Sequence, residues 1–413
     1  MRLGDMRQVT QHKNAAHAAP MGYFRALDGF RGVLALLIAV YHTMWLSHPN
    51  VSIFLANGPP LVDIFFVFSG FLMFTLYRDK INTVADGREF MKRRFARIYP
   101  LHFFMLLIAL CYALARLGAH YMGWATHEAG EILPFQAGAN ETMWSFFTNL
   151  TLTHSLGFHN DLNFNMPSWT VSVEFYAYFV FAAMIIWIRP RKAWHFGVIS
   201  AFVALNYYIL SRLKPNLDFH YDYGFWRCLG GFYTGVVISY VYTKIRPTYA
   251  RLQETVCKRR MFMWGSVIEL IAFLTLLGFI MYCPGKLQFF IAPIAFVFVL
   301  GFAFDMGFIS HVLNRNLFRY LAKISYSIYM VHVVISLFFV IFAESILPHF
   351  FGAGWKEILW LGDVMLIPYL ASVLIFAHFS YRYIELPGRK AILAYDFRAK
   401  TRSIFSTAKH SKA

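Results

Sequence analysis

Charged residues and cysteines are scarce in this sequence of 413 residues. Only 14% of the residues are charged, whereas 58% are hydrophobic and 19% are aromatic. Such a composition excludes a disordered chain and argues against a soluble globular enzyme. The four cysteines have no CxxC or other metal-ligand spacing, so we predict neither a disulfide framework nor a metal site. The sequence also lacks a P-loop, a strand-borne GxGxxG and a GxSxG, which leaves ATP hydrolysis, dinucleotide chemistry and an esterase-type serine without support.

The most prominent feature of the sequence is a series of long apolar runs. A helix of about 20 apolar residues crosses a hydrocarbon layer about 30 Å thick, and the sequence contains ten such runs. We therefore expect an all-α integral membrane protein, a bundle of about ten transmembrane helices. The fifth and eighth runs are short or interrupted by proline, so nine or eleven helices are also compatible with the pattern. The ten runs are residues 27–46, 60–77, 98–117, 169–188, 195–211, 224–243, 262–282, 287–305, 324–346 and 358–381.

Basic residues dominate the polar connections, and the formal net charge is +17. In a soluble protein this charge would raise nucleic acid as a partner. Here Lys and Arg gather in alternate connections, which by the positive-inside bias places both termini in the cytoplasm and explains the charge without nucleic acid. We expect a cytoplasmic basic N-tail over residues 1–24, a transmembrane domain over 25–388 and a cytoplasmic basic C-tail over 389–413. The first run is too long for the apolar part of a signal peptide, so we expect it to be retained.

The first run, LDGFRGVLALLIAVYHTMWL from Leu27, carries two ionisable groups that lipid would reject. Arg31 and His42 are eleven residues apart, which is about three helical turns, so they share one helix face and are separated by about 16 Å. The alternative is an arginine that snorkels to the head groups and a histidine that is satisfied inside the bundle. The paired spacing favours a functional role, because ionisable residues inside membrane spans are by default candidates for a site.

Other runs contain polar groups that would be costly in lipid without partners. The predicted topology places Glu174 of the fourth run and His42 on the outer half of the bundle. We therefore predict that Glu174 orients His42, as a carboxylate does in general-base chemistry. The remaining polar candidates are Asp63 and Ser69 in the second run, Trp169 in the fourth, and Ser325, Tyr326 and His332 in the ninth.

A basic segment, MKRRFARIYPLH, precedes the third run. Its Arg94 and Arg97 are three residues apart and would share a face of a helix, and guanidinium groups suit bidentate binding of phosphate. The alternative is an anchor that contacts lipid phosphates. On the opposite side, the long connection 118–167 contains His120, His127, His154 and His159 without metal-ligand spacing. We interpret these four as ordinary loop histidines, and the second half of the connection as an element that lies on or dips into the membrane.

Taken together, these segments resemble the membrane-bound acyltransferase 3 family, which acylates sugars and other acceptors at bacterial envelopes. The resemblance covers roughly residues 23–388. Its parts are LDGFRG followed by His42 (the Arg-x10-His pattern), VDIFFVFSGF, RRFARIYP, PSWTVSVEFYAYF, SYSIYMVH and YRYIELP.

The resemblance implies an enzyme of the bacterial inner membrane that uses cytoplasmic acyl-CoA, most often acetyl-CoA, and no metal. The implied acceptor is a hydroxyl of a sugar or polysaccharide, such as exopolysaccharide, on the outer side. Arg94, Arg97 and Arg31 would bind the donor, and His42 with Glu174 would carry the chemistry, His42 acting as a base or as an acyl carrier. Asp63, Ser69, Trp169, Ser325, Tyr326 and His332 would bind the acceptor or support the centre.

Several alternatives stay open from the sequence. A proton-coupled secondary transporter or flippase of a glycan or lipid-linked precursor also has many helices with buried charges, and a structural scaffold is a third possibility. The acyl group could be succinyl instead of acetyl. Some members of the family carry a C-terminal SGNH hydrolase-like domain. This chain ends about 30 residues after the last run, so we expect it to work alone or with a separate partner, such as an export or synthase complex.

Overall fold

The computed structural model describes residues 24–124 and 132–395. Within these ranges the chain is helical and contains no strand. The first half comprises α2 (Arg25–Tyr41), α3 (Ile53–Ala56), α4 (Pro60–Tyr77), α5 (Val84–Tyr121), α6 (Met143–Leu150), η1 (Met166–Ser168), α7 (Trp169–Trp187) and α8 (Ala193–Leu213). The second half comprises α9 (Gly224–Thr255), α10 (Lys258–Tyr282), η2 (Gly285–Phe290), α11 (Ile291–Phe302), α12 (Phe308–Leu313), α13 (Asn316–Glu344), α14 (Leu347–Phe351), η3 (Ala353–Glu357), α15 (Leu359–Ser380), η4 (Tyr381–Glu385) and α16 (Leu386–Ala394).

The helices confirm an all-α multi-pass membrane protein. Eight helical segments of the described chain are long and apolar enough to cross a bilayer, and each corresponds to one of the ten expected runs. The other two runs form α2, which has 17 residues, and α9, which has 32 residues and continues well beyond its apolar part. The count of ten and the cytoplasmic location of the termini therefore stay predictions.

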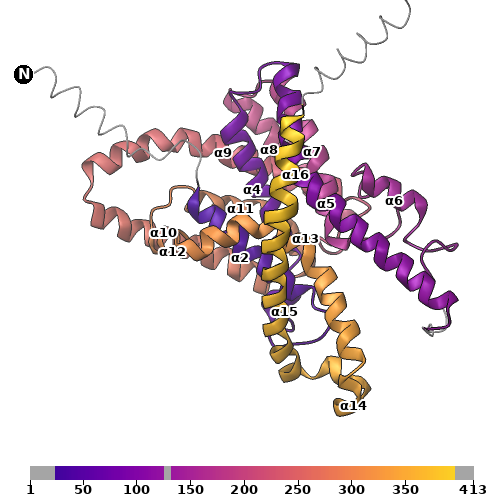
Figure 1. Ribbon diagram of the computed structural model, residues 1–413. Helices are drawn as coiled ribbons and strands as arrows, with labels where there is room; N and C mark the ends of the chain where they lie inside the picture. Colours follow the sequence, from indigo (N-terminus) through magenta and orange to yellow (C-terminus); the bar gives the residue numbers. More distant parts are fainter. Residues whose placement is uncertain (1–23, 125–131, 396–413) are drawn as a thin grey trace, which may run out of the picture.

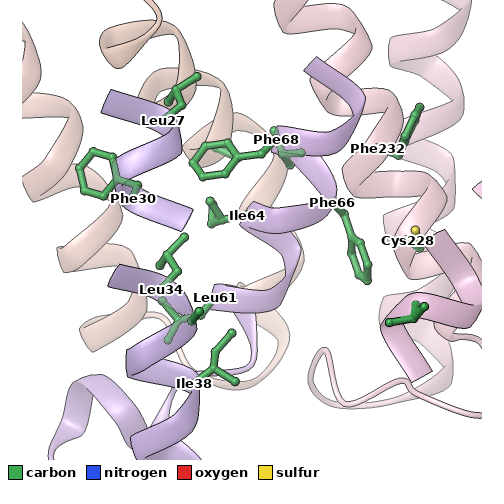
Figure 2. Packing of buried hydrophobic residues seen from close by; sticks show 14 of the residues in the cluster. Leu27, Phe30, Leu34, Ile38, Leu61, Ile64, Phe66, Phe68, Cys228 and Phe232 are labelled. Atoms are coloured by element: carbon green, nitrogen blue, oxygen red, sulfur yellow. The ribbon is translucent and has the colours of Figure 1, made fainter. Parts of the chain in front are cut away.

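The helix α4 packs closely against α9 and more lightly against α2. Apolar side chains of α2 and α4 pack together, among them Leu34 and Ile38 against Leu61 and Ile64, and the α4 ring of Phe66 lies toward α9 (Figure 2). Glycines allow α4 and α9 to come into backbone contact. A Cβ at Gly70 would lie 1.8 Å from a carbonyl oxygen of α9, and one at Gly235 would lie 2.1 Å from a carbonyl oxygen of α4. This close approach fits the small residues that pack helices in membranes.

The helix α5 is much longer than the run 98–117 predicts. It begins at Val84 because Thr83 and Asp86 form a capping box, and it continues for 38 residues, which corresponds to about 57 Å. The segment that contains Arg94 and Arg97 is therefore helical and not a loop. Only residues 78–83 connect α4 to α5. We call the end of the bundle at this connection the basic end.

Two other long helices complete the frame of the site. The helix α13 packs against both α2 and α15. Beyond α15, the chain passes through one π-helical turn at Tyr381–Glu385 and continues into α16 without a break (Figure 1). π-Turns inside helices occur frequently at functional sites, and this one brings Glu385 into the buried interior.

Candidate active site

His42 ends the first helix and does not lie within it. The helix α2 ends at Tyr41, five residues before the expected end of the run, and His42 occupies the position that caps it. Its Nδ1 atom lies 2.9 Å from the carbonyl oxygen of Ile38 and 3.3 Å from Nε2 of His332. The ring of His42 is partly exposed, whereas His332 on α13 is fully buried.

The contacts of the two imidazoles define their tautomers. Nδ1 of His332 lies 2.6 Å from the carbonyl oxygen of Tyr329, so this nitrogen donates and Nε2 of His332 is left as an acceptor. Nδ1 of His42 faces that acceptor and the carbonyl of Ile38, so it carries the proton of the neutral ring. Nε2 of His42 then has a free lone pair, which is what a general base or a nucleophile requires.

Glu174 does not form the predicted pair with His42. Among the described residues, the hydrogen bonds of its carboxylate come from Ser69 and from Tyr178, the latter at 2.6 Å, and none joins it to His42. The reason is depth. Glu174 lies five residues, or about 7.5 Å, inside α7, whereas His42 lies at the very end of α2. Sequence periodicity placed both groups on the same half of the bundle but could not fix this offset.

A small cavity gathers most of the other predicted residues. Its volume is about 80 Å³, and it adjoins the histidine pair through Tyr329, whose ring lines the cavity and whose carbonyl holds His332. Arg31 enters from α2, where it also lies 3.6 Å from Asp28. The polar lining consists of Arg31, Ser69, Thr170, Glu174, Ser325, Tyr326 and Tyr329. The structure thus brings together the residues of four distant runs.

The two arginines of the RxxR pattern have different environments. Arg94 donates to the hydroxyl of Tyr77 at 3.0 Å and lies over the rings of Tyr77, Phe90 and Tyr178 at 5.4–6.0 Å. It has no acidic partner among the described residues, and its Nε is buried without a hydrogen bond. Tyr178 links it to the carboxylate of Glu174. Of the two arginines, Arg94 is therefore the one that no carboxylate contacts directly in the part of the chain that the structure describes.

Arg97 is neutralised by a residue that sequence reasoning did not single out. It forms an ion pair with the fully buried Glu385 of the π-helical turn and lies 5.7 Å from the ring of Tyr326. Ser327 also donates to Glu385 at 3.1 Å. Glu385 is part of the closing motif YRYIELP, but the spacing of residues in the sequence does not indicate that Arg97 is its partner. The expectation that Arg94 and Arg97 both bind the phosphates of the donor stays a prediction, and Arg97 already has an acidic partner.

Asp63 has a structural partner and does not line the cavity. Its carboxylate accepts three hydrogen bonds from Arg227 on α9 at 2.8–3.2 Å, and both side chains are at most 1% exposed. Arg227 also donates to carbonyl oxygens of Pro59 and Phe219 and lies 5.4 Å from the ring of Trp169. The sequence analysis missed Arg227. Asp63 and Trp169 therefore belong to a buried ion-pair cluster that holds α4, α7 and α9 together.

One of the histidines in the connection 118–167, His154, is buried and so is not an ordinary loop residue. Its Nε2 atom lies 3.1 Å from the hydroxyl oxygen of Ser168. Its ring stacks on that of His102 of α5, with ring centroids 5.8 Å apart. Burial, reinforced by the neighbouring His102, lowers the pKa of His154 to about 3. His159 contacts Thr148 at 2.7 Å, and His127 lies outside the described residues. In the part of the chain that the structure describes, no three His, Cys, Asp or Glu side chains gather as a metal site would require.

Comparison with known proteins identifies the family of this chain. The acyltransferase-domain family known as acyltransferase 3 matches residues 24–379, so the chain belongs to that family. It is 22% identical over 385 residues to the peptidoglycan O-acetyltransferase OatA of Listeria monocytogenes, covering 89% of this chain and 56% of that protein. It is also 22% identical over 405 residues to O-acetyltransferase OatA of Staphylococcus aureus, covering 93% of this chain and 60% of that protein.

A shorter match, 38% identical over 97 residues, is to protein 2 in the picA locus of Rhizobium radiobacter, and it covers 23% of this chain and 48% of that protein. The chain therefore spans little more than half the length of the OatA proteins that it matches. No solved structure matches it.

Proposed function

We propose that this protein is a membrane O-acyltransferase of the bacterial inner membrane. It transfers an acyl group, which we propose is acetyl, from cytoplasmic acyl-CoA to a hydroxyl of a glycan or polysaccharide on the outer side of the membrane. The observation that carries the proposal is the histidine pair, which leaves Nε2 of His42 free at the end of α2 opposite the basic end. Family membership and the names of the OatA relatives support the reaction class.

The donor approaches from the basic end. Arg94 supplies an unpaired positive charge there, and the acyl-bearing pantetheine arm follows the polar cavity past Arg31 toward His42. Arg31 lies on α2 and His42, eleven residues later, caps the end of that helix, so the arm has about 16 Å to cover. Glu174, with Ser69 and Tyr178, shapes this cavity and does not orient the histidine.

The chemistry then follows from the tautomer of His42. Nε2 of His42 takes the proton of the acceptor hydroxyl as its oxygen attacks the thioester carbonyl, and the carbon–sulfur bond breaks. The departing thiolate of CoA recovers the proton from the imidazolium. His332 accepts from Nδ1–H of His42 and so holds the imidazole in the orientation that this step needs. In a variant of the scheme, Nε2 attacks the thioester first and passes the acyl group on.

The test is transfer from radiolabelled acetyl-CoA in proteoliposomes that contain the purified protein and extracted envelope glycan. His42→Ala should abolish transfer while the protein still inserts and elutes as a folded species. His332→Ala should lower turnover and leave donor affinity unchanged, since it acts through His42. His349→Ala is the matched control, because His349 is exposed on the short helix α14. Full activity in His42→Ala would refute the proposal.

The same assay separates the enzyme from a proton-coupled transporter or flippase. A carrier would move a glycan or lipid-linked precursor without consuming the thioester, so the free thiol released from acetyl-CoA would stay at background. Acetyl-CoA and succinyl-CoA offered side by side would identify the acyl group. Comparing the exopolysaccharide and other envelope glycans of a deletion strain with those of its parent by mass would then identify the acceptor, including one that is acylated within an export or synthase complex.

A further inference from the structure

A second cluster of arginines lines a hollow at the basic end, apart from Arg94 and the cavity beside Arg31. The hollow has a volume of about 140 Å³ and lies between the end of α4, the connection to α5 and the end of α7. Arg78 follows α4, and Arg189 and Arg191 follow α7, so the chain brings these guanidinium groups together from two segments more than a hundred residues apart. Its lining residues are Arg78, Ile81, Asn82, Ile185, Arg189, Pro190 and Arg191.

The charges in this hollow are only partly compensated. The carboxylate of Asp79 accepts from Arg78 at 3.2 Å and pairs with Arg191 at 3.0 Å. Arg189 donates to the backbone carbonyl oxygens of Asn82 at 3.0 Å and Ile186 at 3.4 Å. Three guanidinium groups against one carboxylate leave two net positive charges in one small concavity. Asp79 bridges Arg78 and Arg191, whereas Arg189 has no carboxylate partner among the described residues.

The backbone turns sharply where α7 ends. Arg189 has φ of 49°, in the left-handed region that side chains other than glycine rarely adopt. A left-handed residue commonly follows the C-terminus of a helix, and the backbone N–H of Arg189 donates to the carbonyl oxygen of Met184 at 3.1 Å. Here this conformation turns the chain immediately after α7, so that Arg189 and Arg191 face the same hollow.

The hollow adjoins the proposed donor path. Tyr77, whose hydroxyl accepts from Arg94, directly precedes Arg78, and the start of α5 packs against the end of α7 at Gly87 and Ile186. The hollow and Arg94 therefore lie toward the same end of the bundle. The two net charges match a phosphate monoester dianion, and guanidinium groups bind such groups through paired hydrogen bonds.

We propose that Arg78, Arg189 and Arg191 bind the 3′-phosphate of CoA, the monoester at the nucleotide end of the donor. This inference rests on the proposed function, since it assumes that acyl-CoA is the donor. The hollow anchors the nucleotide at the basic end while the pantetheine arm enters the bundle beside Arg94. A lipid phosphate offers similar chemistry, and the experiment below distinguishes the two sources.

The test compares CoA with 3′-dephospho-CoA, which lacks only this phosphate. Dissociation constants are measured by calorimetry with the purified full-length chain in phosphatidylcholine nanodiscs. We expect CoA to bind on the order of tenfold more tightly, which corresponds to about 1.4 kcal/mol. Arg189→Gln and Arg191→Gln should each reduce this preference several-fold, mainly by weakening CoA. Arg251→Gln, which removes an exposed charge from the end of α9, should leave it unchanged.

Each outcome decides the question. Equal affinity of the wild-type protein for CoA and dephospho-CoA would overturn the inference and leave the proposed function standing, provided that acetyl transfer occurs. If neither compound binds and no acetyl is transferred, the proposed function fails and the inference fails with it. The lipid alternative predicts that phosphatidic acid in the nanodiscs binds the wild-type protein more than Arg189→Gln while the CoA preference is absent, and this result would also overturn the inference.

Discussion

Replacing Asp63 by asparagine tests whether this residue supports the fold or contacts a substrate. In the structure its carboxylate is fully buried and accepts three hydrogen bonds from Arg227. Asparagine has nearly the same shape, so the substitution removes the negative charge without opening a hole. Arg227 then keeps one amide oxygen of the new side chain and the carbonyl oxygens of Pro59 and Phe219 as acceptors, but it loses its only ion-pair partner among the described residues.

The expected cost is large because the charge that remains is buried. Breaking a buried ion pair by removing one partner typically costs about 3–5 kcal/mol, whereas replacing both partners by apolar residues of similar volume is often neutral or stabilising. We therefore expect Asp63→Asn to lower the free energy of unfolding by about 3–5 kcal/mol. The double variant Asp63→Leu with Arg227→Met should recover most of that loss.

The assay is thermal unfolding of the detergent-solubilised protein, followed by tryptophan fluorescence and by the fraction that elutes as a folded species. Asp161→Asn is the matched control, because Asp161 lies exposed in the connection before η1. Acetyl transfer is measured below the unfolding temperature of each variant. If the Asp63→Asn protein keeps the wild-type unfolding temperature but loses acetyl transfer, the structural role is refuted. That result would instead support a role of Asp63 in binding the acceptor.

Three further predictions concern other contacts. Since burial lowers the pKa of His154 to about 3 from 6.5, the unfolded chain binds a proton that the folded chain does not, so stability falls as the pH drops below about 6.5. At pH 5 the loss is about 2 kcal/mol, and His154→Gln should flatten the unfolding temperature against pH. In a double-mutant cycle on the free energy of unfolding, Glu385→Gln and Arg97→Gln should show a coupling energy above about 1 kcal/mol. Additive effects of the two substitutions would show that the two side chains do not form an ion pair. Gly70→Ala should destabilise by about 1–3 kcal/mol through overpacking, whereas Gly278→Ala, which meets open space, should not.

The sequence predicted the helices well because apolar length is a local property. The bounds of α4 coincide with the expected run 60–77, and those of α7 differ from 169–188 by one residue. The errors occur where a local signal competes with the apolar pattern. Residues 84–97 are too polar to read as a span, yet the capping box at Thr83 starts a helix there.

The candidate site was predicted in part. The sequence indicated which polar residues are too costly to face lipid, and Arg31, Ser69, Glu174, Ser325 and Tyr326 do converge on one cavity. Hydrophobic patterning gives the depth of a residue only approximately and says nothing about which helices are neighbours. For that reason it paired His42 with Glu174, while the structure pairs it with His332. Arg227 and Glu385 were missed for the same reason, since each is recognisable only through its partner.

The size of the cavity bears on the choice between an enzyme and a carrier. About 80 Å³ is room for several water molecules, since a buried water needs at least about 10–15 Å³ of cavity. A glycan or a nucleotide does not pass through such a space, but an extended thioester arm needs little more than its own cross-section. The arrangement therefore favours a protein that keeps the nucleotide at the basic end and admits only the acyl-bearing arm toward His42. A variant of Ser69 or Ser325 with a larger side chain, such as Ser325→Leu, should then block acetyl transfer while CoA still binds at the basic end with unchanged affinity.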